Sequence, residues 1–305
     1  MSKKVAVILV NWNSFALTFN CIDSLQQMVY RDFDILVTDN GSEDGSGKKL
    51  KEHYPGLILI ESPINLGFTG GNNLGMQYAI ENGYEYVILL NNDTFVKNDS
   101  LAVLTTFMDQ HHEAGAIQPM IYFNHDRSLL WNGGSYFNPW LGHTYTVNYN
   151  QSLKPSNSRI KEVGWISGCA FMTRVSVLKQ TGLFPENMFI YYEDVDLSFR
   201  IKKLGYQLIY HPDSVIYHIA GMSNKQKTKG KEGFINPIVH YLNIRNRIWL
   251  LKKHTKGLHI PITFLFNFFY IIAVMGYFVA RLRFTKFRTV LRAVKDGLSG
   301  GIIYK

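Results

Sequence analysis

The chain has 305 residues, 46% of them hydrophobic and 18% charged, which excludes a disordered protein and suffices for a sizeable core. Cys21 and Cys169 form no CxxC pattern, so the sequence indicates neither a disulfide framework nor a zinc site, and a reducing compartment is expected. The apolar run after Lys4 has only six residues, which is too short for a signal-peptide core and is typical of a first strand.

The net charge of +9 is concentrated near the C-terminus. Residues 245–305 hold twelve Lys/Arg and one acid, a net charge of +11, so residues 1–244 together carry −2. A basic tail of this kind suits nucleic acid or an anionic membrane surface. Its basic residues flank a stretch of 24 residues without charge, 257–280, which favours lipid over nucleic acid.

The uncharged stretch 257–280 is long enough to span a bilayer. It contains His259, Pro261 and Asn267, however, and both of its flanks are basic, whereas a spanning helix has more Lys/Arg on one side. We therefore expect a segment that lies in the plane of the cytoplasmic leaflet or dips into it. A spanning helix and a buried helix of a soluble protein are the alternatives.

The first 118 residues alternate strand-like and helix-like segments. Strands are predicted at 5–10, 33–38, 57–61, 86–90 and 115–118, and helices at 16–28, 47–54, 72–82 and 100–110. Almost wholly apolar strands that alternate with helices are typical of a mostly parallel α/β sheet covered on both faces. Such sheets bind ligands at the carboxyl ends of their strands, where the polar clusters 11–13, 39–42, 65–73 and 91–93 fall.

The second half of the chain has a less regular pattern. Residues 119–160 are predicted to form irregular hairpins or a flexible loop over the site. A strand is expected at 163–173, a helix from Glu193 to Gly205, short strands at 207–210 and 214–217, and a mobile exposed loop at 225–233. These patterns predict an α/β domain over residues 1–222 and a basic, helical, membrane-associating region over residues 223–305.

Two carboxylates follow apolar strands directly. Asp93 ends the segment VILLNND, and a carboxylate there can bind Mg²⁺ or Mn²⁺, which take one or two protein carboxylates and fill their shell with substrate phosphates. Asp39 lies in VTDNGSEDGS, where it can accept hydrogen bonds from a base or from ribose hydroxyls. The alternative for both segments is a turn or a helix cap.

The stretch NLGFTGGNNLG, residues 65–75, places Gly70 and Gly71 before a predicted helix. The first backbone N–H groups of a helix bind anions. The glycine spacing does not match GxGxxG, so a dinucleotide fingerprint is rejected.

The segment MFIYYEDVDLSFRIKKLG, residues 188–205, places Glu193 and Asp194 in the first turn of a helix, behind Tyr191 and Tyr192. A carboxylate held there can take a proton from an attacking hydroxyl. The helix N-terminus lowers a carboxylate pKa, while apolar neighbours and a nearby phosphate raise it. The alternative is that these acids only stabilise the helix dipole.

The order of six segments resembles the inverting family-2 glycosyltransferases of GT-A fold, above all the rhamnosyltransferase subgroup. The resemblance covers residues 4–220 and is carried by VILVNWN, VTDNGSEDGS, NLGFTGGNNLG, LLNNDT, GWISGCAFMTR and YYEDVDLSFRIKKLGY. A looser similarity continues in HYLNIRNRIWLLKKH at 240–254. The QxxRW motif of processive synthases is not found.

The resemblance implies a role for each matching position. Asp194 would be the general base, beside Glu193, and Asp93 with His218 would hold Mg²⁺ or Mn²⁺. The nucleotide-sugar site would contain Asn11, Asn13, Asp39, Gly71, Asn73, Asn91 and Asn92. The donor-sugar or acceptor pocket would be lined by Trp165, Gly168, Tyr192 and Arg200. Because Asn91 replaces the first carboxylate of the family's DxD motif, the metal would bind more weakly or be dispensable.

The implied activity is transfer of a sugar, with inversion, from a nucleotide diphosphate to a hydroxyl of a lipid-linked or cell-surface glycan. L-rhamnose from dTDP-rhamnose is the expected donor. The alternatives are a UDP-hexose or UDP-HexNAc donor, and a non-enzymatic protein whose basic tail binds membranes or nucleic acid. We expect a cytoplasmic protein, peripheral or monotopic at the inner face of the cell membrane, with an anionic membrane surface and no nucleic acid as partner. The oligomeric state is left open, a homodimer included.

Overall fold

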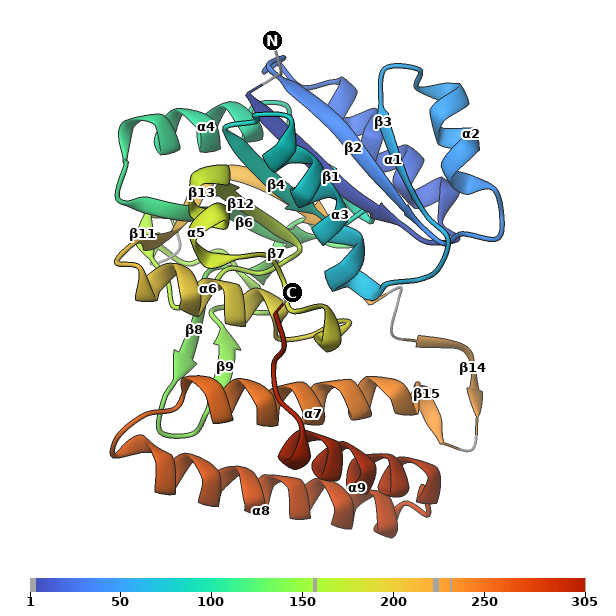
Figure 1. Cartoon of the computed structure of the whole chain (residues 1–305), viewed down its shortest axis with the longest axis vertical. Helices are drawn as coiled ribbons and strands as arrows, with labels where there is room; N and C mark the ends of the chain where they lie inside the picture. Colours follow the sequence, from blue (N-terminus) through green and yellow to red (C-terminus); the bar gives the residue numbers. More distant parts are fainter. Residues whose placement is uncertain (1–3, 156–157, 222–224, 231, 305) are drawn as a thin grey trace.

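The computed structural model describes residues 4–155, 158–221, 225–230 and 232–304. An α/β body occupies one end of the elongated molecule and a layer of three helices the other (Figure 1). The body is built on an eleven-stranded sheet whose central path has the order β10-β7-β6-β12-β4-β1-β2-β3. Its parallel half consists of β1 (Val5–Asn11), β2 (Phe33–Asn40), β3 (Ile58–Ser62) and β4 (Tyr86–Leu90).

Beyond β4 the sheet becomes mixed. β12 is antiparallel to both β4 and β6, while β13 is parallel to β6 and antiparallel to β5 and β11. The strands of this half are β5 (Thr94–Val96), β6 (Ala114–Phe123), β7 (Leu129–Asn132), β10 (Gln151–Ser152), β11 (Lys161–Glu162), β12 (Ala170–Arg174) and β13 (Gln207–His218). Two hairpins lie outside the sheet, β8 (Ser135–Asn138) with β9 (His143–Thr146), and β14 (Lys225–Gly230) with β15 (Gly233–Ile235).

Helices cover both faces of the sheet because successive strand residues point to opposite sides. In β1, Val5, Val7 and Leu9 belong to one core, and Ala6 and Ile8 belong to the other. The first core is closed by α1 (Phe15–Gln26), α2 (Ser46–His53) and α4 (Ser100–Gln110). The second core is closed by α3 (Gly67–Glu81), α5 (Val175–Thr181) and α6 (Glu193–Lys203). The predicted α/β sheet covered on both faces is confirmed.

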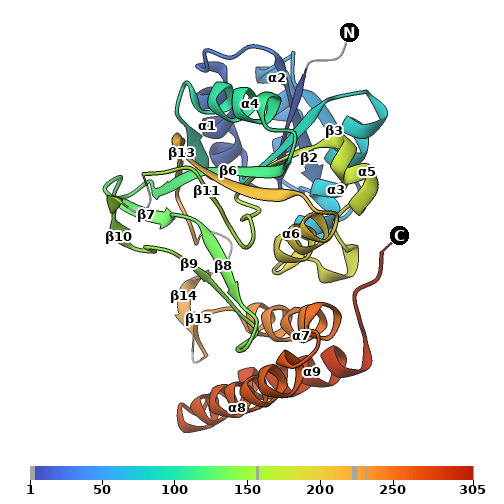
Figure 2. The same cartoon turned by 90° about the vertical axis from the view of Figure 1, so that its left-hand side faces the viewer.

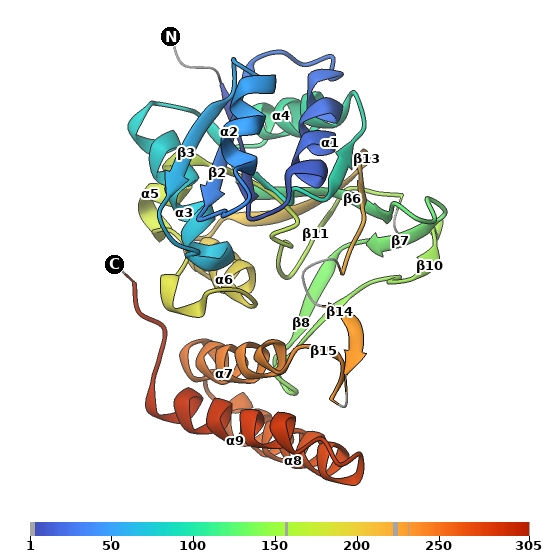
Figure 3. The ribbon, with the colours of Figure 1, turned by 90° about the vertical axis from the view of Figure 1, so that its right-hand side faces the viewer.

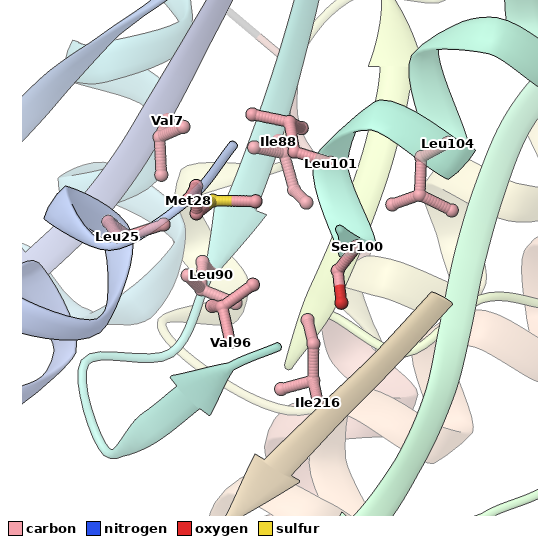
Figure 4. Close-up of a pocket in the computed structure, with 10 residues that line it drawn as sticks. All are labelled: Val7, Leu25, Met28, Ile88, Leu90, Val96, Ser100, Leu101, Leu104 and Ile216. Carbon is pink, nitrogen blue, oxygen red and sulfur yellow. The ribbon is translucent and has the colours of Figure 1, made fainter. Parts of the chain in front are cut away.

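A small apolar gap remains inside the first core (Figure 4). Side chains of β1, β4, α1 and α4 line it, and its only polar side chain is Ser100, whose hydroxyl donates to the carbonyl of Val215 at 2.6 Å. This gap contains none of the polar strand ends, so it is a packing space of the core and not the predicted site.

Three predicted segments differ from the structure. The helix expected at 72–82 begins at Gly67, because Asn65 Oδ1 accepts from Gly67 N (2.8 Å) and Asn40 Oδ1 accepts from Leu66 N (3.0 Å), which satisfies N–H groups at the earlier start. The two short strands at 207–217 are one strand with a register shift at 211–215. The expected loop 225–233 contains β14 and β15 instead, although residue 231 lies outside the described residues.

The strand expected at 163–173 is regular only from Ala170 onward. The N–H groups of residues 163–165 donate to backbone carbonyls of β13 and β8, but those of residues 166–169 are bound by side chains instead of by a neighbouring strand. Ile166 N donates to Ser198 Oγ at 3.0 Å and Gly168 N donates to Asp194 Oδ2 at 2.8 Å. This segment therefore leaves the sheet and lies against the start of α6.

The C-terminal region forms a layer of three helices, α7 (Pro237–His254), α8 (His259–Ala280) and α9 (Phe284–Ser299), around its own small core. α7 lies between α6 and the pair of α8 and α9 (Figures 1 and 2). The β8–β9 hairpin extends down to this layer, where Thr263 Oγ1 donates to the carbonyl of Pro139 (2.6 Å) and Asn267 Nδ2 to that of Leu141 (3.0 Å). The structure thus resolves the predicted irregular hairpins of 119–160 into paired strands.

α8 is one helix of 22 residues that by length and composition suffices to cross a membrane. Only 17% of its most apolar stretch is buried, which contradicts the alternative of a buried helix in a soluble core. It lies across the end of the molecule (Figure 1), and many of its apolar side chains are exposed. The large exposed side chains of α8 are Ile260, Ile262, Leu265, Phe266, Phe268, Phe269, Tyr270, Ile272, Tyr277 and Val279.

A buried carboxylate connects the body to the C-terminal layer. Asp196 of α6 is fully buried and accepts hydrogen bonds from Arg200 Nε (2.8 Å), His254 Nε2 (2.7 Å), Lys253 Nζ (3.1 Å) and Tyr304 OH (2.6 Å). After α9 the chain runs back past α7 to reach α6 (Figure 3). Burial raises the pKa of Asp196, but the His254 hydrogen bond and the positive charges of Arg200 and Lys253 outweigh it, so the pKa lies below its ordinary value.

Replacing Asp196 by Asn should lower the free energy of unfolding by about 3 kcal/mol or more, because the buried cations around it lose their counter-charge. Urea denaturation at pH 7 measures this. The control Asp99→Asn removes an exposed partner of Lys97 (3.4 Å) and should cost at most about 1 kcal/mol. Because the Asp196 pKa is lowered, its stabilisation exists above the ordinary value of 3.8 and disappears as the pH falls through the lowered pKa. Equal losses in the two variants would contradict this account.

Candidate active site

The carboxyl ends of β1 and β2 lie side by side and bring Asn11 next to Asp39. Asn11 Nδ2 donates to Asp39 Oδ1 (3.3 Å) and to Ser46 Oγ (2.6 Å), while Thr18 Oγ1 donates to Asn11 Oδ1 (2.8 Å). Asn92, after β4, extends the network by donating to Thr18 Oγ1 (2.8 Å). Asn11, Thr18 and Asp39 are buried. Hydrogen bonds therefore hold the polar groups of three strand ends in one preformed arrangement.

Asn13 and Asp39 are both tied to the loop that follows β2. Asn13 has a φ of +48° and accepts from Glu43 N at 2.8 Å through its Oδ1. Asp39 faces the first turn of α2, where a Cβ on Gly47 would lie 2.2 Å from Asp39 Oδ2. Only glycine allows this close approach, so the loop and α2 are built around the carboxylate. The predicted contacts of both residues with a base and ribose stay predictions.

The glycine-rich stretch has a packing role at the positions predicted to bind the nucleotide. Gly71 lies inside α3, where a Cβ would approach Val10 Cγ1 to 2.8 Å, so it allows α3 to lie close to β1. Asn73 uses both of its polar atoms on the backbone of Phe184, donating to its carbonyl (2.9 Å) and accepting from its N–H (3.0 Å). The expectation that Gly71 and Asn73 open the helix is wrong, because the helix begins four residues before Gly71.

Asp93 and His218 come together although 125 positions separate them. Asp93 Oδ1 lies 3.1 Å from His218 Nε2, and Asn91 Nδ2 lies 3.4 Å from the same ring nitrogen. The pairing of β5 with β13 causes this proximity, since Thr94 is the register partner of His218. Both side chains are buried, with 9% of Asp93 and 6% of His218 exposed, and the ring of Trp131 packs edge-on against the imidazole at 4.6 Å.

The pair of Asp93 and His218 fits a divalent ion that takes most of its ligands from a substrate. No third His, Cys, Asp or Glu joins these two in a metal-binding group within the described parts of the chain. Mg²⁺ and Mn²⁺ accept one or two protein ligands together with phosphate oxygens and water, so two protein ligands suffice. The second ring nitrogen of His218, Nδ1, is buried without a hydrogen-bond partner.

Two buried thiols lie near Asp93. Burial raises the pKa of Cys21 to about 12, and burial together with the charge of Asp93 raises that of Cys169 well above its ordinary value. Both cysteines are free. Among the described residues, neither thiol joins Asp93 and His218 in a group of potential metal ligands.

The loop before α6 has an unusual backbone. Phe189, Tyr191 and Tyr192 have φ values of +66°, +77° and +70°, a left-handed conformation that is costly for residues other than glycine. Such strain persists only where surrounding contacts enforce it. Here the enforcing contacts come from the side chain of Asn246 on α7 and from its neighbour Arg245.

Asn246 is fully buried and its Nδ2 lies within hydrogen-bond distance of three carbonyl oxygens of this loop. The distances are 2.9 Å to Met188, 2.9 Å to Ile190 and 3.0 Å to Tyr191. Arg245 Nη2 adds a hydrogen bond of 3.1 Å to the carbonyl of Met188. α7 therefore positions the loop that leads into Glu193 and Asp194.

Asp194 is held as a buried acceptor at the start of α6. Its Oδ2 accepts from Gly168 N (2.8 Å) and its Oδ1 from Val195 N (2.8 Å). Burial raises the pKa of Asp194 to about 6 against the opposing effect of these N–H groups. Burial and the neighbouring Asp194 raise the pKa of Glu193 well above its ordinary value, and Glu193 Oε2 is buried without a partner. The two N–H groups favour the ionised form of Asp194, whereas no hydrogen bond supports a negative charge on Glu193 Oε2.

The four predicted pocket residues have different surroundings. A Cβ on Gly168 would lie 3.6 Å from Asp194 Cβ, so the backbone there approaches Asp194 closely. Trp165 Nε1 donates to the carbonyl of Tyr136 at 3.0 Å, which fixes the indole against the β8–β9 hairpin. Tyr192 directly precedes the acidic pair. Gly168 and Tyr192 thus adjoin Asp194, whereas the contacts of Trp165 are with the β8 strand.

Arg200 does not fit its predicted role in the pocket. Besides Asp196, its guanidinium donates to the carbonyls of Thr181 (2.7 Å), Gly182 (2.8 Å) and Leu183 (2.9 Å). Three of its four hydrogen bonds join α6 to the end of α5 and the fourth stays within α6, so we interpret Arg200 as a structural residue.

The sequence analysis missed Thr18 and Asn246. Thr18 looks like one more residue of an amphipathic helix, and only the position of α1 over the ends of β1 and β4 brings it between Asn11 and Asn92. Asn246 lies in the NIRNR segment of the looser family similarity, and a polar residue within an otherwise apolar helix face was the available signal.

The chain matches a family model and is similar to several known proteins. The family model of Glycosyl transferase family 2 matches residues 6–182, more than half of the chain. The N-acetylglucosaminyl-diphospho-decaprenol L-rhamnosyltransferase of Mycobacterium tuberculosis (strain ATCC 25618 / H37Rv) is 27% identical, with 86% of this chain and 89% of that protein covered. The dTDP-rhamnosyl transferase RfbF of Shigella flexneri is 23% identical, with 86% of this chain and 83% of that protein covered.

Solved structures with a similar fold include three transferases. TarS 1-349 of S. aureus in complex with UDP-GlcNAc is 16% identical with a TM-score of 0.59, over 97% of this chain and 81% of that one. The mannosyltransferase PcManGT from Pyrobaculum calidifontis, in complex with GDP-Man and Mn²⁺, is 14% identical with a TM-score of 0.57, over 99% and 77%. GalNAc-T7 with UDP, GalNAc and Mn²⁺ is 17% identical with a TM-score of 0.61, over 75% and 45%.

These identities with solved structures concern the fold alone, while the family model establishes the family. The predicted family and the predicted GT-A fold are both confirmed. The chain belongs to glycosyl transferase family 2 and is a glycosyltransferase enzyme with the GT-A fold.

Proposed function

We propose that this glycosyltransferase moves L-rhamnose from dTDP-rhamnose to a hydroxyl of a lipid-linked or cell-surface glycan, with inversion at the anomeric carbon. The names of two relatives support the sugar and the nucleotide, since one is an L-rhamnosyltransferase and the other a dTDP-rhamnosyl transferase. The name of the first relative also supports a lipid-linked acceptor, N-acetylglucosaminyl-diphospho-decaprenol.

The observation that carries the proposal is the Asp194 carboxylate, fixed by two backbone N–H groups and ionised near neutral pH because its pKa is about 6. The acceptor hydroxyl attacks the anomeric carbon and gives its proton to Asp194. The new bond joins the acceptor oxygen to that carbon, and the bond from the carbon to the diphosphate oxygen breaks. One displacement from the face opposite the leaving group inverts the configuration.

Asp93 and His218 would hold a divalent ion beside the diphosphate of the donor. The ion supplies positive charge that stabilises the leaving diphosphate. Two structures of similar fold contain Mn²⁺, which supports a metal in this position. With a single carboxylate where the DxD motif has two, we expect weak binding of the metal before the donor arrives.

A UDP-sugar donor is the second candidate. The TarS structure contains UDP-GlcNAc, and a poly-beta-1,6-N-acetyl-D-glucosamine synthase of Staphylococcus epidermidis is 21% identical over 75% of this chain and 54% of that protein. Asn11, Asp39 and their neighbours would form hydrogen bonds with uracil or thymine alike. Membership of an enzyme family speaks against the non-enzymatic alternative based on the basic tail.

We further propose that the enzyme works at the inner face of the membrane, with α8 in the plane of the lipid. The exposed apolar side of α8 and the basic residues of α9 lie on the same end of the molecule (Figure 1). A helix that lies across this end would insert its outer side into the headgroup region, while Lys and Arg contact anionic lipids.

A panel of dTDP- and UDP-sugars, each with and without Mn²⁺, tests the donor and the metal together. We expect release of dTDP from dTDP-rhamnose, stimulated by Mn²⁺. His218→Gln should raise the Mn²⁺ concentration for half-maximal rate by about tenfold or more, because it removes one of two protein ligands. His111→Gln, at a partly exposed histidine directly after α4, is the control. Release from a UDP-sugar alone would favour the second candidate, and no release from any donor would refute the proposal.

Asp194→Asn and Glu193→Gln should differ sharply. The first substitution removes the base and should lower kcat by about 10²-fold or more. The second replaces a buried acid, whose Oε2 has no hydrogen-bond partner, by an amide of similar shape, so most of the activity should remain. In the wild type, kcat/KM should rise with pH up to the pKa of Asp194, about 6, and level off above it, because only the carboxylate accepts the proton. Stopped assays of the released nucleotide across pH 4.5–8 measure the activities of the variants and the pH profile of the wild type. Equal losses of activity in the two variants would contradict the assignment of Asp194 as the base.

Replacing Phe268 and Phe269 together by Glu should weaken binding to phosphatidylglycerol vesicles by about a hundredfold, because burial of each ring in lipid is worth about 1.5–3 kcal/mol. Both rings are exposed, at 59% and 58%, so folding should be unaffected. Val29→Glu, an equally exposed apolar residue of the body, is the control. Cosedimentation measures the binding, and unchanged binding of the double variant would exclude α8 as the lipid contact.

A further inference from the structure

Arg247 of α7 is a buried cation whose positive charge is not neutralised. Only 8% of the residue is exposed, and its Nη2 has no hydrogen-bond partner. Its Nε donates to Asn267 Oδ1 at 2.6 Å, and its guanidinium lies 4.9 Å from the ring centre of Tyr270. Burial raises the pKa of the Tyr192 hydroxyl, and the nearby positive charge of Arg247 opposes this effect. In the described part of the chain, no Asp or Glu lies within ion-pair distance of Arg247.

Arg200 has a negatively charged partner, whereas Arg247 has none among the described residues. Arg200 is also largely buried, but Asp196 and three carbonyl oxygens surround it. The charge of Arg247 acts on a neighbouring histidine: burial and, after it, this charge lower the pKa of His143. A guanidinium keeps its charge in proteins, and a buried charge without a counter-ion is costly. An unpaired buried arginine is therefore expected where an anion binds.

The position of Arg247 limits which anion that is. On one side its neighbour Tyr192 directly precedes Glu193 and Asp194, and the adjacent Asn246 holds the same loop. On the other side its partners Asn267 and Tyr270 belong to α8, whose outer face is apolar. Figure 2 shows α7 between α6 and α8. Arg247 thus lies between the base and the apolar helix.

We infer that Arg247 binds a phosphate of the acceptor, at the junction between its sugar and its lipid; this inference rests on the proposed function. The sugar hydroxyl then reaches Asp194, the phosphate meets the guanidinium, and the hydrocarbon chain follows α8. The planar guanidinium forms paired hydrogen bonds with phosphate oxygens. The diphosphate of the donor is assigned to the other end of the site, beside Asp93 and His218.

A phospholipid headgroup would offer the same chemistry, but the burial of Arg247 favours the acceptor. Headgroups of a planar membrane meet exposed cations, and such cations are present on the outside of α9, for example Arg288. Arg247 is about nine-tenths buried beneath α8. We therefore expect its ligand to enter between the helices and the loop before α6.

Binding of farnesyl diphosphate and of farnesol to the full-length chain, both in EDTA, tests the site without turnover. The wild type should bind the diphosphate more tightly than the alcohol. Arg247→Gln should weaken binding of the diphosphate by roughly 10- to 100-fold, the value of a hydrogen bond between charged groups, and leave farnesol binding unchanged. Arg247→Lys keeps the charge but not the paired geometry, so its affinity for farnesyl diphosphate should lie between those of the wild type and Arg247→Gln. Arg288→Gln, with the same change of charge on an exposed residue, should bind like the wild type.

The thermal midpoint of Arg247→Gln separates binding from folding. Loss of an unpaired buried charge should leave the midpoint unchanged or raise it, whereas loss of a structural arginine would lower it. Equal binding of farnesyl diphosphate by wild type and Arg247→Gln would overturn the inference, and so would a lowered midpoint with parallel losses for diphosphate and alcohol. Equal affinity for inorganic diphosphate and farnesyl diphosphate would also overturn it, because the site would then take a free anion.

Two further measurements separate this inference from the proposed function. If Arg247→Gln weakens cosedimentation with phosphatidylglycerol vesicles as strongly as it weakens farnesyl diphosphate binding, the site is a headgroup site and the inference fails. If the wild type binds farnesyl diphosphate through Arg247 but releases nucleotide from no donor, the proposed function fails and the site stands. Active enzyme whose acceptor KM does not respond to Arg247→Gln would leave the function standing and refute the site.

Discussion

The structure depends on one buried amide. Asn246 Nδ2 lies within hydrogen-bond distance of three backbone carbonyl oxygens in the loop that carries Tyr191 and Tyr192 in left-handed conformations. Without these contacts the loop would relax to less costly backbone angles. The orientation of α6 would then no longer aim Asp194 at the N–H of Gly168. The position of the proposed base is therefore set by a helix that lies outside the α/β body.

The dependence of the base on α7 changes the meaning of the C-terminal region. The predicted boundary at residue 222 follows a change in composition. Contacts cross this boundary, however: Asn246 binds the loop before α6, and Lys253, His254 and Tyr304 bind Asp196. Residues 237–304 form hydrogen bonds with the loop before α6 and with α6 itself. They also provide the apolar surface of α8. Removal of the tail would disturb the base together with any lipid contact, so substitutions on the exposed side of α8 separate the two roles better than truncation.

Much of the site could be predicted because polar residues that end apolar strands must meet at one edge of a parallel sheet. Asn11, Asp39 and Asp93 followed from that rule, and the raised pKa of Asp194 agrees with its expected apolar surroundings. The glycines of residues 65–75 were misinterpreted, because a glycine that breaks a helix and one that lets a helix lie close to a sheet look alike in sequence. Gly71 is of the second kind, as its contact with Val10 requires.

The sequence by itself determined the sheet, the polar ends of its strands and the family, since these depend on local patterns of apolar and polar residues. Only the tertiary structure decided which distant residues complete the site. Asp93 meets His218 through strand pairing across 125 positions, Asn246 reaches the loop before α6, and Arg247 lies next to Tyr192 with no carboxylate beside it among the described residues. Contacts between residues so far apart leave no periodic trace in a single sequence, because each partner looks locally like an ordinary member of its own strand or helix.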